Sequence, residues 1–229
     1  MTVKTINGHV QKTEDVTSDL RILYIKLEQK FTFKAGQYIN VHQNGYDERS
    51  YSIANAPLNN NIIELHVRRG ENLSAYLCDE IISGSPITIS GPYGNCTYKA
   101  QCKKPILALA GGAGLAQIKS LIEKALQTNR TNPVYLYHGA QEVSGLYRDN
   151  YFKQLAKQDS RLIYHPIISH EKPENEAIKY GFLMDHVKHD FNSLKNFRTY
   201  MCGAPEMVAA LEKILIEKGI DPKRIHADK

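Results

Sequence analysis

The hydrophobic rhythm of the chain changes near Lys103, and this change limits its fold more than any other feature of the sequence. Before Lys103, short segments rich in β-branched and aromatic residues are separated by Gly, Asn, Asp and Pro, which is typical of strands and turns. After it, apolar segments of strand length alternate with segments of helical periodicity. The sequence therefore predicts two domains: an N-terminal antiparallel β-barrel over residues 1–102 and a C-terminal α/β domain with a parallel sheet over residues 103–229.

Individual elements follow from the same patterns. In the first domain we expect one short helix over 74–82, with Ser74 as its N-cap, and strands over 20–27, 37–41, 62–67 and 86–90. In the second domain we expect strands over 106–110, 133–138, 162–168 and 198–202. Helices are expected near 149–157 and over 205–218, the latter ended by Gly219. A further helix begins behind Gly114, with one face formed by Leu115, Ile118, Leu121, Ile122 and Ala125.

Charge and hydropathy exclude several classes of protein. The net charge of +5 arises from 29 basic and 24 acidic residues that are interspersed, so it does not favour binding to nucleic acid. No apolar run approaches the roughly 20 residues that a membrane helix needs, and the first residues lack the apolar core of a secretory signal. We therefore expect no nucleic-acid partner and no membrane insertion.

The cysteines indicate the compartment and limit the cofactors. Cys78, Cys96, Cys102 and Cys202 follow none of the spacings typical of metal sites. Reduced thiols and a cytoplasmic location are the natural expectation. The spaced cysteines that ligate an iron–sulfur cluster are missing, so we expect no such cluster and no metal in this chain.

A glycine-rich turn is the strongest local signal in the second domain. The segment LALAGGAGLAQIKSL runs from an apolar strand through Gly111, Gly112 and Gly114 directly into a helix. Such a turn brings backbone N–H groups and a helix N-terminus close to a pyrophosphate. The full dinucleotide fingerprint is missing, because Gln117 stands where its third glycine would be. Taken alone, the turn is either a nucleotide site or a tight strand–helix connection that binds nothing.

A second turn, in YMCGAPEM, follows the last expected strand. Cys202 and Gly203 lie at its tip, and a helix begins at Pro205. Ligands of open parallel sheets bind outside the carboxyl ends of the strands. Both turns are expected at that edge, so they can face one ligand from two sides. Alternatively, Cys202 is a small residue packed in a turn.

These motifs resemble a known family when they are read together. Residues 33–38 (FKAGQY), 49–52 (RSYS) and 91–94 (GPYG) resemble the barrel domain of the ferredoxin–NADP⁺ reductase superfamily, and LAGGAGLA and MCGAPEM resemble its nucleotide domain. The resemblance implies an enzyme that transfers a hydride from NADH or NADPH to a flavin, as an NAD(P)H:flavin reductase does. The flavin would be FAD, or FMN or riboflavin used as a substrate. The alternative is an FAD-containing electron-transfer component that passes electrons to a ferredoxin, an oxygenase or another protein.

The resemblance also implies which residues form the sites. The flavin site would comprise Arg49, Ser50, Tyr51, Ser52, His66, Val67 and Ser74, and the nicotinamide site Gly111, Gly112, Gly114, Cys202 and Gly203. Arg49 would hold a flavin phosphate through charge-assisted hydrogen bonds, and Tyr51 would stack on the flavin ring. His66 and Val67 would contribute backbone groups, and Ser74 would help to bind phosphate. Ser52, near flavin N5, and Cys202, beside the nicotinamide C4, would act at the reacting atoms by positioning.

Departures from the family pattern leave some properties open. The phosphate segment 69–74 keeps Ser74 but only one glycine, which leaves open whether the flavin is tightly held or exchangeable. The chain stops at Lys229, where members commonly continue with a residue that covers the flavin, so either the site is more open or the end has been trimmed. Glu142, after the second strand of the α/β domain, favours NADH, because a carboxylate binds a ribose hydroxyl and repels a 2′-phosphate. Arg148 could still reach such a phosphate.

Overall fold

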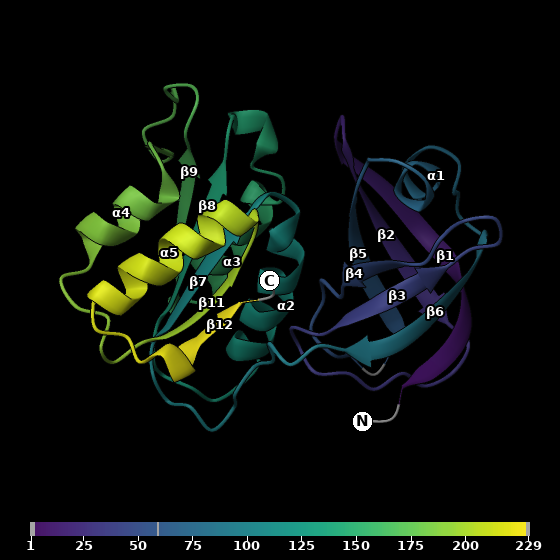
Figure 1. The fold of residues 1–229 in the computed structure, drawn as a ribbon, viewed down its shortest axis with the longest axis horizontal. Helices are drawn as coiled ribbons and strands as arrows, with labels where there is room; N and C mark the ends of the chain where they lie inside the picture. Colours follow the sequence, from purple (N-terminus) through teal and green to yellow (C-terminus); the bar gives the residue numbers. More distant parts are fainter. Residues whose placement is uncertain (1–2, 59, 228–229) are drawn as a thin grey trace. The chain divides into compact units, whose positions relative to one another are not determined.

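The computed structural model describes residues 3–58 and 60–227. The chain divides into two compact units (Figure 1). The first unit comprises residues 1–98 together with 119–124, and the second comprises residues 99–118 and 125–229.

The first unit is an antiparallel barrel, as predicted. Its sheet has the order β4-β3-β6-β1-β2-β5, and an isolated bridge between Ile53 and Leu65 links its two edges. The strands are β1 (Lys4–Thr17), β2 (Leu20–Leu27), β3 (Tyr38–His42), β4 (Arg49–Ser52), β5 (Ile62–Arg68) and β6 (Pro86–Tyr93). The four predicted strands correspond to β2, β3, β5 and β6. Strand β1 was not predicted because it carries few apolar residues, although Ile6 and Val10 alternate inward from it.

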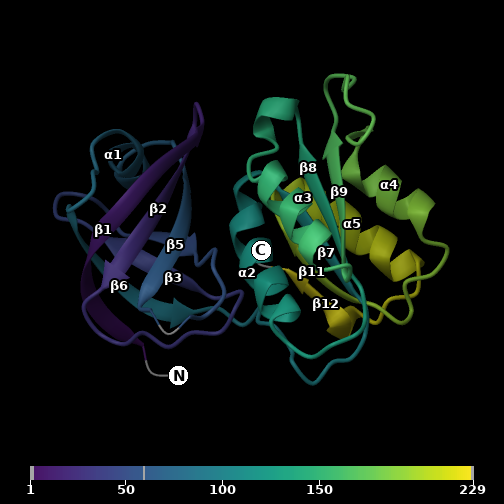
Figure 2. The same cartoon turned by 180° about the vertical axis from the view of Figure 1, so that it is seen from behind.

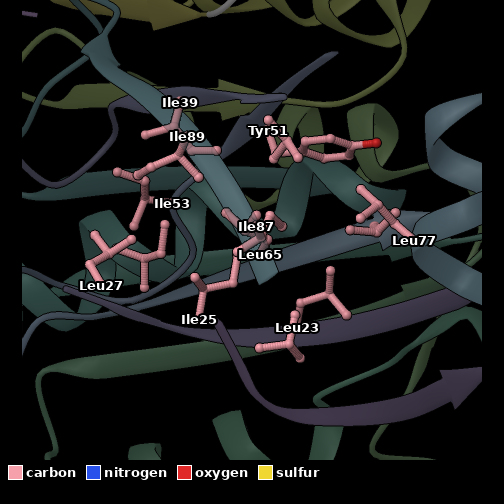
Figure 3. Packing of buried hydrophobic residues seen from close by; sticks show 14 of the residues in the cluster. Leu23, Ile25, Leu27, Ile39, Tyr51, Ile53, Leu65, Leu77, Ile87 and Ile89 are labelled. Atoms are coloured by element: carbon pink, nitrogen blue, oxygen red, sulfur yellow. The ribbon is translucent and has the colours of Figure 1, made fainter. Parts of the chain in front are cut away.

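The barrel interior is filled by apolar side chains from every strand, with Tyr51 as the contribution of β4. Figure 3 shows part of this core, in which Tyr51 points toward Leu77 of the short helix α1 (Leu73–Asp79). The predicted N-cap of this helix was wrong. Ser74 lies inside the first turn, because Leu73 is drawn into the core and Asn72 takes the preceding position with a φ of 53°. A positive φ is uncommon for residues other than glycine, and Asn is enriched among those that adopt it.

A buried charge network belongs to the first unit. Lys119 Nζ lies 2.8 Å from a carboxylate oxygen of Glu64 and 2.7 Å from one of Glu123. The other Glu64 oxygen lies 2.9 Å from His66 Nε2. Burial alone would raise the pKa of Glu64, but the hydrogen bond from His66 and the charge of Lys119 outweigh it and lower the pKa to about 2. The residues 119–124 are therefore tied to the barrel through charged side chains.

The second unit contains the predicted parallel sheet. Its order is β10-β9-β8-β7-β11-β12. The strands are β7 (Ile106–Gly111), β8 (Val134–Ala140), β9 (Leu162–Ile168), β10 (Lys179–Tyr180), β11 (Arg198–Cys202) and β12 (Ile225–Ala227). The four predicted strands are β7, β8, β9 and β11. The two edge strands were not predicted because they are only two and three residues long.

Helices cover both faces of this sheet. Figure 1 shows α4 (Leu183–Asp190) and α5 (Pro205–Glu217) on one face, and Figure 2 shows α2 (Leu115–Leu126) and α3 (Asp149–Gln158) on the other. The residues predicted to form the inner face of α2 are all buried, and Gly219 follows α5 with a φ of 84°. Helix α4 was not predicted. None of the helices formed by the described residues combines the length and apolar character that a membrane crossing needs.

Candidate active site

Strand β4 brings Arg49 to the predicted phosphate residue Ser74. Arg49 Nη1 donates a hydrogen bond to Ser74 Oγ at 3.2 Å, and Ser74 Oγ donates to the Glu71 carbonyl at 2.9 Å. Ser74 is fully buried, whereas Arg49 is exposed. The two side chains to which the family resemblance assigned phosphate binding therefore lie together.

Gly70 keeps space open beside this pair. A Cβ at this position would lie 3.1 Å from Ser74 Oγ and 4.0 Å from Arg49 Nη1. A side chain here would therefore fill the surface that Arg49 and Ser74 present. Segment 69–74, which departs from the family pattern, thus has its one glycine next to both Arg49 and Ser74.

Tyr51 is held by the barrel core and carries a buried hydroxyl that bonds to nothing among the described residues. Its side chain is 8% exposed and packs near Leu77 (Figure 3). Burial raises the pKa of this phenol to about 12, so it stays protonated at neutral pH. A buried hydroxyl without a partner costs free energy that a hydrogen-bonding ligand can recover. The core covers most of the ring, so the predicted stacking of Tyr51 on a flavin stays a prediction.

His66 and Val67 occupy β5 differently. The His66 side chain belongs to the charge network, at 2.9 Å from Glu64, and Val67 is fully buried in the core. Neither side chain is available to a ligand, so the predicted contact through backbone groups stays a prediction. Ser52 is partly buried and pairs with Tyr38 of β3, and Ser50 Oγ donates to Asn40 at 2.7 Å.

In the second unit, the two glycine-containing turns meet. Strands β7 and β11 are neighbours, with Ala110 opposite Cys202, and β8 lies on the other side of β7. The strand order therefore reverses here, and parallel sheets bind ligands at such switch points. The carboxyl ends of β7 and β11 place the glycine-rich turn beside Cys202 and Gly203, as the sequence predicted.

Close backbone contact explains why these turns need glycine. A Cβ on Gly114 would lie 2.4 Å from the Cys202 carbonyl oxygen and 2.7 Å from the Gly203 nitrogen. A Cβ on Gly203 would lie 2.3 Å from Met207 Cε and 3.3 Å from Gly111 Cα. The turns therefore form a surface made of main chain, which suits the close approach of a dinucleotide.

Met207 is a contributor that the sequence analysis missed. Its sulfur would lie 2.8 Å from a Cβ on Gly111, so this one thioether fills the space that side chains on both turns would need. Its place in MCGAPEM was the available signal: it follows the Cys-Gly tip by a few residues and lies in the first turns of α5. Met207 therefore supports both turns from the helix side.

Two other family motifs brace the barrel. Gln37 accepts a hydrogen bond from the Lys34 amide at 2.7 Å and donates to the Gly94 carbonyl at 3.2 Å. The rings of Tyr38 and Tyr93 lie 5.6 Å apart. Segments 33–38 and 91–94 are thus held together by a hydrogen bond and by ring contact.

In the part of the chain that the structure describes, no group of three His, Cys, Asp or Glu residues is arranged to hold a metal.

Comparisons with known proteins match a family domain in both the N-terminal and the C-terminal part of the chain. Residues 7–98 match the family model for an oxidoreductase FAD-binding domain, and residues 108–213 match that for an oxidoreductase NAD-binding domain. The naphthalene 1,2-dioxygenase system ferredoxin–NAD(P)(+) reductase component of Pseudomonas putida is 34% identical over 227 residues, which span 98% of this chain and 69% of that protein. The chain belongs to the ferredoxin–NADP⁺ reductase superfamily.

Other members of the superfamily match over most of the chain. A probable flavin reductase of Photobacterium leiognathi is 33% identical over 93% of this chain and 92% of its own length. The crystal structure of the Amycolatopsis cytochrome P450 reductase GcoB has a TM-score of 0.92 at 29% identity, covering 99% of this chain and 70% of that chain. This superfamily member is thus an NAD(P)H-dependent flavin oxidoreductase, with an FAD-binding domain that contains β4 and an NAD-binding domain that contains both glycine turns.

Proposed function

We propose that this oxidoreductase holds its flavin along strand β4 and its nicotinamide dinucleotide at the two glycine turns. The observation that carries the proposal is the Arg49–Ser74 pair, with Gly70 beside it and the unbonded Tyr51 hydroxyl two residues farther along β4. A cation, a hydroxyl and a buried donor in this order suit a phosphate followed by a polyhydroxyl chain. When bound, the flavin supplies the chemistry of accepting a hydride from the nicotinamide.

The residues of the chain act by positioning. Arg49 provides a fixed positive charge for the flavin phosphate, and the Tyr51 hydroxyl donates to the ribityl chain. Ser52 lies near flavin N5, with His66 and Val67 contributing main-chain groups. Gly111, Gly112, Gly114 and Gly203 admit the nicotinamide dinucleotide, and Cys202 lies beside the nicotinamide ring. None of these residues needs to act as an acid or a base, because orientation and water exclusion lower the barrier to hydride transfer.

Two fates of the electrons fit this site. Release of reduced free flavin is supported by the likeness to the Photobacterium protein, which is named a probable flavin reductase and matches over 92% of its length. Transfer to a partner protein is supported by the Pseudomonas putida relative, named a reductase component of a dioxygenase system. Steady-state NADH oxidation, together with gel filtration, distinguishes the two functions. Saturable dependence on added riboflavin or FMN would support the first, whereas FAD retained through gel filtration and turnover only with an acceptor protein would support the second.

The finer properties are also proposals. We expect NADH to be preferred, because exposed Glu142 follows the carboxyl end of β8. Arg148 lies farther along, and comparison of the kcat/KM values for NADH and NADPH decides between the two. A cytoplasmic location rests on the cysteine spacing. The domain boundary is proposed between Cys102 and Lys103.

Cys202 offers a direct test of the nicotinamide site. We expect Cys202→Ala to slow flavin reduction by about tenfold while leaving flavin affinity unchanged, because a lost contact at the reacting ring disturbs orientation rather than flavin binding. Stopped-flow reduction rates and flavin titrations measure the two effects separately. Reduction at the parent rate would show that Cys202 is packing only.

A further inference from the structure

Two side chains of helix α2 bind both ends of a single peptide group just beyond strand β4. Within the first unit, Ser120 Oγ donates a hydrogen bond to the Asn55 carbonyl at 2.7 Å. The Glu123 carboxylate accepts a hydrogen bond from the Ala56 amide at 2.8 Å. That carbonyl and that amide belong to the same planar peptide group and point in opposite directions. The two bonds therefore fix the orientation of this peptide as well as its place.

The segment that contains this peptide is held by hydrogen bonds more than by side-chain bulk. Ala54 N–H donates to the Glu64 carbonyl at 2.7 Å, and the Asn55 side-chain oxygen accepts from the Glu64 amide at 2.8 Å. Ala54 and Ala56 are fully buried, but each carries only a methyl group. Packing of large side chains thus contributes little to the position of residues 54–56, and the bonds from α2 become correspondingly important.

The held peptide lies close to the proposed hydride-accepting end of the flavin. It begins three residues after Ser52, a span of at most about 11 Å of main chain. The intervening residues, Ile53 and Ala54, are fully buried. Because protein interiors are closely packed and transmit strain, a shift of the held peptide is passed on to Ser52. Hydride transfer is sensitive to such a shift, since a misplacement of 1 Å can cost about 100-fold in rate.

We propose that Ser120 and Glu123 are positioning residues for hydride transfer, because they fix the peptide that sets the place of Ser52 against the flavin ring. The inference rests on the proposed function, since it needs flavin N5 near Ser52. Both residues act through the main chain. Flavin affinity, which the proposed function assigns to Arg49 and Ser74, does not depend on them.

The test measures flavin reduction and flavin affinity separately in the full, flavin-loaded chain. Ser120→Ala should slow stopped-flow reduction at saturating NADH about tenfold and change flavin affinity less than twofold, because it frees one end of the peptide. At Glu123 two uncharged variants are compared, and both lose the ion pair with Lys119. Glu123→Gln keeps an oxygen that can accept from the amide and should reduce flavin about tenfold faster than Glu123→Met, which has none.

The control removes a similar hydroxyl elsewhere in the barrel. Ser83 Oγ donates to the Gln11 carbonyl at 2.9 Å, so Ser83→Ala loses the same kind of bond and should keep the parent rate. Urea unfolding shows that each variant is folded under the assay conditions.

Three results would overturn the inference: reduction at the parent rate in Ser120→Ala, equal rates in the two Glu123 variants, or a parallel loss of flavin affinity and reduction rate. A parallel loss would assign a structural role to both side chains. The proposed function fails differently, because neither NADH nor NADPH then reduces flavin on the parent chain. In that case the inference fails with it.

Discussion

The two units build their proposed sites by opposite means. The barrel offers side chains, the Arg49 guanidinium and the buried Tyr51 hydroxyl, and the same unit contains a charged network around Lys119. The α/β unit offers main chain that becomes accessible only because Gly114 and Gly203 lack a Cβ. Substitutions in the barrel should therefore act through lost charge and hydrogen bonds. Substitutions in the turns of the α/β unit should act through added bulk.

The largest effect is expected from breaking the charge network of the barrel unit. Lys119→Met should lower the free energy of unfolding by about 3–5 kcal/mol, because Glu64 keeps a buried charge whose cationic partner is gone. Urea unfolding at neutral pH measures the loss. Lys124→Met, in the same helix but outside this network, is the control and should change stability by less than about 0.5 kcal/mol.

The same network predicts a pH dependence with a definite sign. The pKa of Glu64 is lowered to about 2, so its stabilising contribution is complete above the ordinary pKa of 4.5 and is lost as the pH falls toward 2. Glu64→Gln should therefore flatten the acid side of the stability curve in this window. An unchanged acid transition in Glu64→Gln, or a tolerated Lys119→Met, would mean that the barrel unit does not depend on buried charge.

The next effect is expected from adding bulk to a turn. Gly114→Ala should reduce NAD(P)H-dependent activity by about 100-fold, since its Cβ would lie 2.4 Å from the Cys202 carbonyl oxygen and the turns must shift. Flavin affinity should stay at the parent value. Gly84→Ala, in the barrel unit, is the control for activity: a Cβ there meets nothing within 4 Å, and although the φ of 90° makes the substitution costly in stability, the folded variant should keep the parent activity. Equal activity in both variants would contradict the account of the glycine turns.

Substitution of Arg49 tests whether the barrel unit binds flavin through its side chains. Arg49→Ala should weaken flavin binding by about 1.5–3 kcal/mol, the contribution of a charge-assisted hydrogen bond. Arg68→Ala removes a half-exposed arginine that pairs with Asp19 on the surface, and it should leave flavin affinity unchanged. If the Arg49 variant binds flavin as tightly as the parent in fluorescence titrations, the phosphate assignment is wrong.

The smallest expected effect comes from Tyr51→Phe, which should change protein stability and flavin affinity in opposite directions. Tyr51→Phe removes a buried hydroxyl that has no partner among the described residues. The flavin-free protein should be unchanged or more stable by about 1 kcal/mol, whereas flavin binding should weaken by about 1 kcal/mol. Thermal unfolding with and without flavin separates the two. A variant that is destabilised without flavin would place the hydroxyl in a structural role.

The sequence predicts those structural features that depend on residues close together in the chain, and it misses those that depend on distant residues. Strands β2, β9 and β11 are predicted at their observed bounds, because their apolar patterns are uninterrupted. Strand β1 was not predicted, because its own composition does not indicate a strand. It forms through pairing with β2 and β6. The bond between Arg49 and Ser74 spans 25 residues, and only the family resemblance indicated it. The Glu64–Lys119 pair forms through a close contact that no spacing in the sequence encodes.

The central claim is that this chain moves a hydride from a nicotinamide to a flavin held on β4. Its most direct test is anaerobic addition of NADH to the flavin-loaded protein, followed through the flavin absorbance at about 450 nm. Hydride transfer of this kind predicts full bleaching in the parent, faster with NADH than with NADPH, and strongly slowed bleaching in Gly114→Ala at equal flavin occupancy. A flavin that stays oxidised in the parent under both nucleotides would contradict it.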